Sequence, residues 1–166
     1  MELSVSRVQD EITDEDLSYV LKNPWKFSIY EWKLYNIHNE KTAFDTLMEQ
    51  FKLSRNGGFS KVFRTADNLP LLILMAVKIS ETALHCYLVA SKHMEENNQA
   101  LKVTFEMRKI LEEQSCNYEG CKLVVYSQSR ETEKQMSWLR FIGLKYKPEG
   151  NLGDAKYFEY ESRENV

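Results

Sequence analysis

The sequence contains few cysteine, proline and glycine residues, and this scarcity argues against several classes of protein. Its 166 residues include three cysteines, three prolines and six glycines. No two cysteines form a Cys-x-x-Cys pair, so neither a disulfide framework nor a zinc site is expected, and we predict no bound metal. The low glycine and proline content also argues against disordered or low-complexity segments. No apolar run approaches the roughly 20 residues that a membrane-spanning helix requires.

Net charge is also small, at −3. A chain with this charge has no broad attraction to nucleic acid, so a nucleic-acid partner is not expected. The first five residues, Met-Glu-Leu-Ser-Val, lack the basic start and the apolar stretch of a signal peptide. We therefore expect the protein to remain in the cytoplasm and to have no membrane partner.

The overall amino-acid composition is that of an ordinary globular domain. Hydrophobic residues make up 43% of the chain and charged residues 28%, as in typical soluble domains. A chain of this length can bury a core of its own. We expect a single domain that covers residues 1–166.

Hydrophobic periodicity predicts helices and strands in a definite order. Helices are expected at residues 13–22, 39–53, 95–114 and 130–142, and strands at residues 59–66, 69–77, 83–90, 121–126 and 155–160. The three strands in the middle follow one another through short turns, as in an antiparallel meander. The next strand follows the longest helix, which favours a parallel neighbour. The order predicts an α/β fold with a mixed, largely antiparallel central sheet and helices on both faces.

The longest predicted helix carries a stripe of residues that we expect to face the core. They are Leu101, Thr104, Phe105, Met107 and Leu111. Glu95 and Glu96 suit the first turn of this helix, because the helix dipole favours negative charge there.

Residues 25–37 are dense in aromatic side chains, which include Trp25, Tyr30, Trp32 and Tyr35. One interpretation is that these rings cover one end of the core. The other is that they form a surface that binds another protein, since tryptophan and tyrosine are enriched at such sites. The sequence leaves both interpretations open.

The end of the chain carries a resemblance to a known family. Residues 138–144 read Trp-Leu-Arg-Phe-Ile-Gly-Leu, as in a helix stopped by a glycine, and a short aromatic strand follows at residues 155–160. With the order of elements, this ending resembles the GNAT superfamily of N-acetyltransferases over residues 10–160. It is also similar to the small GNAT-like internal virion proteins of short-tailed bacteriophages.

The resemblance implies a cofactor loop that this chain has changed. In the superfamily a Q/R-x-x-G-x-G/A loop opens the longest helix, and its glycines let backbone amides approach the pyrophosphate of CoA. Residues 91–100 read Ser-Lys-His-Met-Glu-Glu-Asn-Asn-Gln-Ala, without a glycine. Glu95 and Glu96 would also place negative charge beside the pyrophosphate. The main expectation is therefore that no cofactor binds.

The alternative is that the amides after Met94 still hold acetyl-CoA. In that case Lys92, Asn97, Asn98 and Gln99 are the residues that we expect to bind the cofactor.

Catalytic positions of the superfamily are also changed. Leu139 stands where relatives often carry the tyrosine that protonates the leaving thiolate. Tyr126 or Tyr146 could take its place, with Tyr126 the candidate that we favour, although an ordinary packing role for either tyrosine stays open. His93 lies between a strand and the longest helix and is the candidate base. His85 lies within an apolar strand and is expected to be a hydrogen-bonded core histidine.

Two functions follow from these expectations. The main hypothesis is a non-catalytic protein of the acetyltransferase fold that acts by binding another protein, as a phage virion component or a factor directed at host machinery. The alternative is a divergent acyl-CoA-dependent N-acetyltransferase. Because one fold serves many functions, the resemblance alone does not choose between them.

Overall fold

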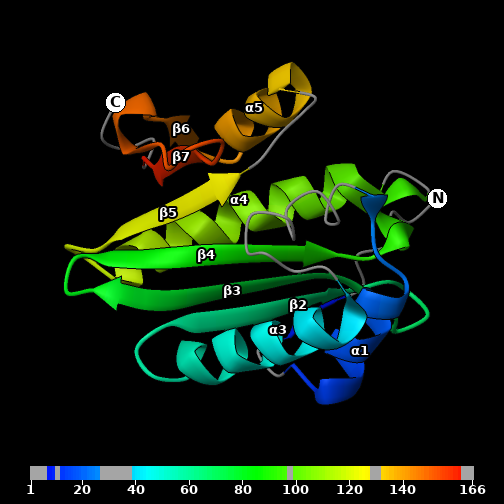
Figure 1. Ribbon diagram of the computed structural model, residues 1–166. Coiled ribbons are helices and arrows are strands. Elements are labelled where there is room, and N and C mark those ends of the chain that lie inside the picture. Colours follow the sequence, from blue (N-terminus) through cyan, green and yellow to red (C-terminus); the bar gives the residue numbers. More distant parts are fainter. Residues whose placement is uncertain (1–6, 10–11, 27–38, 97–98, 128–131, 162–166) are drawn as a thin grey trace.

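A computed structural model describes residues 7–9, 12–26, 39–96, 99–127 and 132–161 of the chain (Figure 1). Its elements are β1 (Arg7–Gln9), α1 (Asp14–Lys22), α3 (Glu40–Ser54), β2 (Phe59–Arg64), β3 (Pro70–Ser80), β4 (Ala83–Ala90), the 3₁₀ helix η2 (Lys92–Glu95), α4 (Gln99–Asn117), β5 (Lys122–Ser127), α5 (Thr132–Phe141), β6 (Leu144–Tyr146), the 3₁₀ helix η3 (Pro148–Gly150) and β7 (Lys156–Tyr160). The expected helices and strands are all present. The short strands β1 and β6 were not predicted.

The strands form one mixed sheet with the order β1-β2-β3-β4-β5-β7-β6. Every neighbouring pair is antiparallel except β4 and β5, which run parallel. Figure 1 shows α1 and α3 beside β2 and β3, and α5 with β6 and β7 at the opposite end of the sheet. The predicted fold class, an α/β fold with a largely antiparallel sheet, is confirmed.

The start of α1 is fixed by a reciprocal capping box. The Thr13 hydroxyl accepts from the Asp16 amide at 3.1 Å, and an Asp16 carboxylate oxygen accepts from the Thr13 amide at 3.1 Å. The same carboxylate accepts two hydrogen bonds from the Arg64 guanidinium on β2, at 2.9 and 2.7 Å. Asp16 therefore both caps α1 and connects this helix to the sheet.

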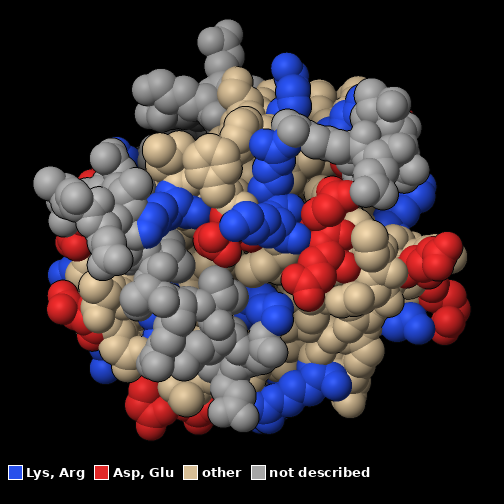
Figure 2. Space-filling view, turned by 180° about the vertical axis from the view of Figure 1, so that it is seen from behind, with Lys and Arg blue, Asp and Glu red and all other residues tan. Residues whose placement is uncertain are grey.

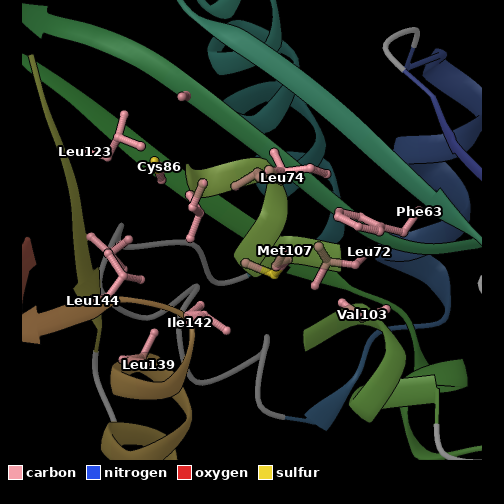
Figure 3. Packing of buried hydrophobic residues seen from close by; sticks show 14 of the residues in the cluster. Phe63, Leu72, Leu74, Cys86, Val103, Met107, Leu123, Leu139, Ile142 and Leu144 are labelled. Carbon is pink, nitrogen blue, oxygen red and sulfur yellow. The ribbon is translucent and has the colours of Figure 1, made fainter. Parts of the chain in front are cut away.

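Two hydrophobic clusters lie on opposite faces of the sheet. The cluster under α1 and α3 contains Ile12, Leu17, Val20, Leu21, Ala43, Leu47, Phe51, Val62, Ile73, Met75 and Val89. The larger cluster lies between the sheet and the helices α4 and α5, and Figure 3 shows it around Leu74, Cys86, Met107, Leu123 and Leu139. Helices on both faces were predicted, and the two clusters explain why both faces of β3 are apolar.

The prediction for the longest helix was wrong in two respects. The helix begins at Gln99, so Glu95 and Glu96 precede it and lie outside its first turn. Leu101 and Phe105 are exposed at 53% and 48%, and Phe105 packs edge-on against Phe141. Positions four apart share one helix side, and here that side faces outward. The core stripe instead contains Val103, Thr104, Met107, Ile110 and Leu111.

Gly143 ends α5, as the sequence predicted, and connects this helix to β6. Its φ angle is +104°, in the left-handed region that favours glycine. An added Cβ would lie 2.4 Å from the ring of Tyr160 on β7. The glycine therefore serves both the sharp turn and the close approach of the last strand.

Within the described ranges no helix is long and apolar enough to cross a membrane. The same residues contain no group of three or more side chains that could hold a metal ion.

Candidate functional site

The parallel strands β4 and β5 diverge soon after they pair. Their register contains three residue pairs, Ala83 with Lys122, Leu84 with Leu123 and His85 with Val124. Beyond those pairs β4 continues to Ala90 and β5 to Ser127. Figure 1 shows the two arrows starting side by side and separating toward their tips. The backbones of the two strands therefore form a V at their carboxyl ends, and we call this separation of the strands the β4–β5 opening.

The edge of β4 that lines this opening has its own polar backbone groups. The Ala90 carbonyl accepts from the Trp25 amide at 3.0 Å, on the side away from β3. Backbone groups alternate in direction along a strand, so the N–H and C=O of Leu88 point to the same side as those of Ala90. Leu88 lies between the last pair with β5 and the hydrogen bond to Trp25. Its peptide groups face the opening.

The far end of the opening is closed by the segment after α1. Pro24 forms an antiparallel bridge with Ser91, in which Trp25 donates to Ala90 and Lys92 donates to the Asn23 carbonyl at 2.8 Å. Trp25 is half-buried and packs against the larger core cluster. This placement supports its predicted role at one end of the core. Tyr30, Trp32 and Tyr35 lie outside the described residues, so their predicted role stays untested.

The described part of the connection from β4 to α4, residues 91–96, is a closed turn. Besides Lys92, the amides of Met94, Glu96 and Gln99 donate to the carbonyls of Ser91, His93 and Glu96, at 3.1, 3.1 and 2.9 Å. These amides are used inside the protein, whereas an anion-binding loop directs its amides outward. The glycine-free sequence thus folds into a turn without the usual cradle for a pyrophosphate in residues 92–96.

His93 lies in this turn and joins it to α1. Its Nε2 is 2.5 Å from the Tyr19 hydroxyl, and its Nδ1 is 3.0 Å from a Glu96 carboxylate oxygen. The Tyr19 and His93 rings are stacked, with centroids 5.9 Å apart. Burial, and then the Glu96 charge, raises the pKa of Tyr19. When Nδ1–H donates to Glu96, Nε2 accepts from Tyr19, which is the order of a hydroxyl, a base and an orienting carboxylate.

The residues predicted to bind a cofactor surround the same turn. Lys92 is exposed on η2, and Gln99 is buried as the first residue of α4. Asn97 and Asn98 lie outside the described residues. The structure therefore brings Lys92 and Gln99 to the two ends of the β4–α4 connection, as the sequence order requires.

Contacts between aromatic rings run from β4 through β5 to β7. His85 and Tyr87 lie on β4 with ring centroids 4.2 Å apart, His85 contacts Tyr126 of β5 at 5.3 Å, and Tyr126 contacts Tyr157 of β7 at 5.2 Å. Burial lowers the pKa of His85 to about 4, so its ring is neutral at physiological pH. Beside Tyr157, Glu159 accepts a hydrogen bond from the Tyr157 hydroxyl at 2.8 Å.

The two predicted catalytic residues belong to different networks. Tyr126 contacts His85 and Tyr157, whereas His93 contacts Tyr19 and Glu96. Sequence reasoning missed the participation of Tyr19, Tyr157 and Glu159. The spacing of Tyr157 and Glu159 places them on one face of the last strand and could have indicated them. Nothing local indicated Tyr19, because its contact with His93 spans 74 residues.

Charges on the opposite side of the molecule are mixed. Figure 2 shows Lys and Arg side chains interspersed with Asp and Glu among the described residues of that view. This distribution gives no support to a broad nucleic-acid surface.

Comparisons with known proteins show similarity in structure but not in sequence. No protein-family model matches the chain, and no curated protein matches its sequence. A PaiA N-acetyltransferase from Thermoplasma acidophilum, solved with coenzyme A, matches with a TM-score of 0.59 and 15% identity, over 94% of this chain and 98% of that chain. An acetyltransferase from Streptococcus agalactiae matches with a TM-score of 0.64 and 10% identity, over 94% and 98% of the two chains.

A third similar structure is a GNAT superfamily phosphinothricin acetyltransferase from Sinorhizobium meliloti, solved with AcCoA. Its TM-score is 0.57 and its identity 9%, over 94% of this chain and 88% of that chain. None of the three is a virion protein, so the suggested relation to phage proteins has no support here. Identities this low establish architecture alone. The chain has the GNAT acetyltransferase fold.

Proposed function

We propose that the protein is a divergent acyl-CoA-dependent N-acyltransferase. The observation that carries this proposal is the V-shaped opening between β4 and β5, with the peptide groups of Leu88 on its edge. An extended ligand with amide groups can pair with such an edge as an added strand does. The pantetheine arm of CoA is a ligand of this kind. Three similar acetyltransferases, two of them solved with CoA or AcCoA, support the same assignment.

The residues of the opening fit the arm of CoA better than its pyrophosphate. The edge around Leu88 would hold the arm. The pyrophosphate would depend on Lys92 and on the N-terminus of α4 at Gln99, because the turn at residues 92–96 uses its own amides. We therefore expect the arm to contribute a larger share of affinity than the phosphates do.

Tyr126 is the proposed proton donor. It lies on β5 after the last residue paired with β4, and its half-buried ring contacts His85 and Tyr157. Acetyl-CoA, when bound, supplies an activated acyl group that an amine accepts as the carbon–sulfur bond breaks. The Tyr126 hydroxyl would hold the proton that the leaving sulfur requires. His93, in its chain with Tyr19 and Glu96, is the proposed route for the proton that the amine releases.

Calorimetry with fragments of the cofactor tests this proposal. Acetyl-CoA should bind with a measurable heat, acetyl-pantetheine should retain most of the binding free energy, and adenosine 3′,5′-bisphosphate should bind weakly. Transfer of the acetyl group to an amine, followed by release of the free thiol, should then be detectable. Binding of the bisphosphate without acetyl-pantetheine would contradict the role given to the Leu88 edge.

A second candidate function is the binding of another protein without catalysis. The observation that favours it is the closed, glycine-free turn at residues 91–96, which follows β4. On this alternative neither acetyl-CoA nor acetyl-pantetheine changes the heat signal or the thermal midpoint. The same calorimetric series therefore separates the two functions.

A further inference from the structure

One face of β5 and β7 carries polar aromatic residues, whereas the same face of β3 carries aliphatic ones such as Ile73 and Met75. Tyr126 and Tyr157 are register partners, as are Val124 and Glu159, so these side chains share a face. Val125 and Phe158, their neighbours along the strands, point to the other face and belong to the core under α4 and α5. The tyrosines and Glu159 therefore lie on the face that α1 and α3 cover farther along the sheet.

Glu159 supplies a carboxylate held in a fixed position. Its side chain is 19% exposed. The Tyr157 hydroxyl donates to Oε1 at 2.8 Å, and Lys122 Nζ lies 3.4 Å from the same oxygen. Lys122 is 64% exposed, so this ion pair is weakly held and solvent competes for it. Both contacts use Oε1, and no described residue donates a hydrogen bond to Oε2.

The rings beside Glu159 favour a cation. The Tyr126 and Tyr157 rings are tilted by 48° with centroids 5.2 Å apart, and the edge of His85 completes the wall. Ring faces attract positive charge, most strongly where water is partly excluded. His85 is neutral, so it adds no repulsion. Burial, followed by the hydrogen bond to Glu159, raises the pKa of Tyr157, so its hydroxyl stays a donor.

We propose that Tyr126, Tyr157 and Glu159 bind a protonated amine of the acyl acceptor, which is an aliphatic amine with a second positive charge. One nitrogen of such a molecule accepts the acyl group while the other, as an ammonium, contacts Glu159 Oε2 and the two rings. This inference rests on the proposed function for the reaction, but the cation site itself requires only the three side chains.

Kinetics with two acceptors of equal length test the site. The acceptors are 1,4-diaminobutane, whose second end is charged, and 4-amino-1-butanol, whose second end is neutral. The diamine should have a KM at least about 10-fold lower, because a charged partner is worth more than a neutral one. Glu159→Gln should remove this preference, so that the two acceptors have equal KM values.

Two further variants keep the test specific. Glu113→Gln makes the same charge change on an exposed position of α4, and the preference should persist. Tyr157→Phe keeps the ring but removes the hydroxyl that orients Glu159, and the preference should fall about 3-fold. A preference unchanged in Glu159→Gln, or equal KM values in the unaltered protein, would overturn the inference.

Direct binding separates this inference from the proposed function. The diamine is titrated into the protein without CoA while tyrosine ring resonances are followed by NMR. Binding that Glu159→Gln abolishes, without any acyl transfer, would refute the proposed function and support the cation site. Acyl transfer without a diamine-dependent shift would refute the cation site alone. Neither transfer nor binding would refute both.

Discussion

The two halves of one sheet face differ in chemistry and in what covers them. Under α1 and α3 the face is made of Val62, Ile73 and Met75, each with 0% exposure. Past β4 the same face carries Tyr126 and Tyr157, both half-buried. Aliphatic side chains pack well but cannot bind a polar ligand, whereas tyrosines offer apolar rings with hydroxyl groups. The half under α1 and α3 stabilises the fold, and the half with the tyrosines, which no described helix covers, is where we propose that a ligand binds.

The largest expected effect lies in the half under α1 and α3, at the ion pair of Asp16 with Arg64. Both side chains are less than a tenth exposed. Asp16→Asn would remove the carboxylate that accepts two hydrogen bonds from the buried guanidinium, so the free energy of unfolding should fall by about 4 kcal/mol. Urea denaturation measures this change. Asp14→Asn, in the same helical turn but exposed, should cost less than about 1 kcal/mol, and equal costs would contradict the assignment.

The ion pair of Asp16 with Arg64 also predicts that the stability of the protein falls in acid. Burial by itself raises the pKa of Asp16, but hydrogen bonds from Arg64 and Thr13 outweigh it, and the pKa lies below its ordinary value of 3.8. A carboxyl with a depressed folded pKa contributes stability above its unfolded pKa and loses it as pH falls through the folded pKa. Stability should therefore fall below about pH 4, and this part of the loss should be absent in Asp16→Asn.

The next largest loss of stability is expected when a cavity is created in the half of the face that α1 and α3 cover. Ile73 is fully buried between the sheet and the α1–α3 layer. Ile73→Ala should lower the free energy of unfolding by about 3 kcal/mol, through lost burial and the void that remains. Thermal unfolding followed by circular dichroism measures it. Ile79→Ala, at a position 54% exposed on the same strand, is the matched control and should have little effect.

His85 lies on β4, between the two halves of this sheet face, and should make the free energy of unfolding depend on pH. Its folded pKa of about 4 lies below the unfolded value of 6.5 because burial disfavours the charged ring. The unfolded chain therefore binds more protons between these values, and stability should fall as pH drops from about 6.5 to about 4, by about 3 kcal/mol in total. His85→Gln should flatten the stability profile over that window. A profile with the same slope in both proteins would show that His85 is not buried as a neutral group.

The smallest stability change is expected in the half with the tyrosines. Tyr126→Phe keeps the ring and its packing, so unfolding should change by less than about 1 kcal/mol. Loss of the proton donor should nevertheless lower kcat by about 30-fold, with little change in KM for acetyl-CoA. Tyr146→Phe, whose hydroxyl bonds to Asn151, is the matched control and should retain activity. Equal activity in both variants would remove Tyr126 from the mechanism.

The sequence predicted the features that depend on neighbouring residues and missed those that depend on contacts between distant residues. The first helix, the bounds of β4 and the helix stop at Gly143 were all predicted, because each depends on a few consecutive residues. The outward side of α4 was not, since Leu101 and Phe105 satisfy the same helical spacing as the true core stripe. Which stripe faces the core is decided by the neighbour it meets, here α5 and the sheet.

The amino-acid sequence by itself determined the order of elements, the glycine-free turn after β4 and the two-sided apolar core, because these follow from periodicity and backbone preference. Only the tertiary structure decided that β4 and β5 part after three residue pairs, that Tyr19 meets His93, and that Tyr126 lies beside Tyr157. Those contacts depend on strand register and on residues far apart in the chain. No local pattern encodes them, since each is fixed by how the whole sheet packs.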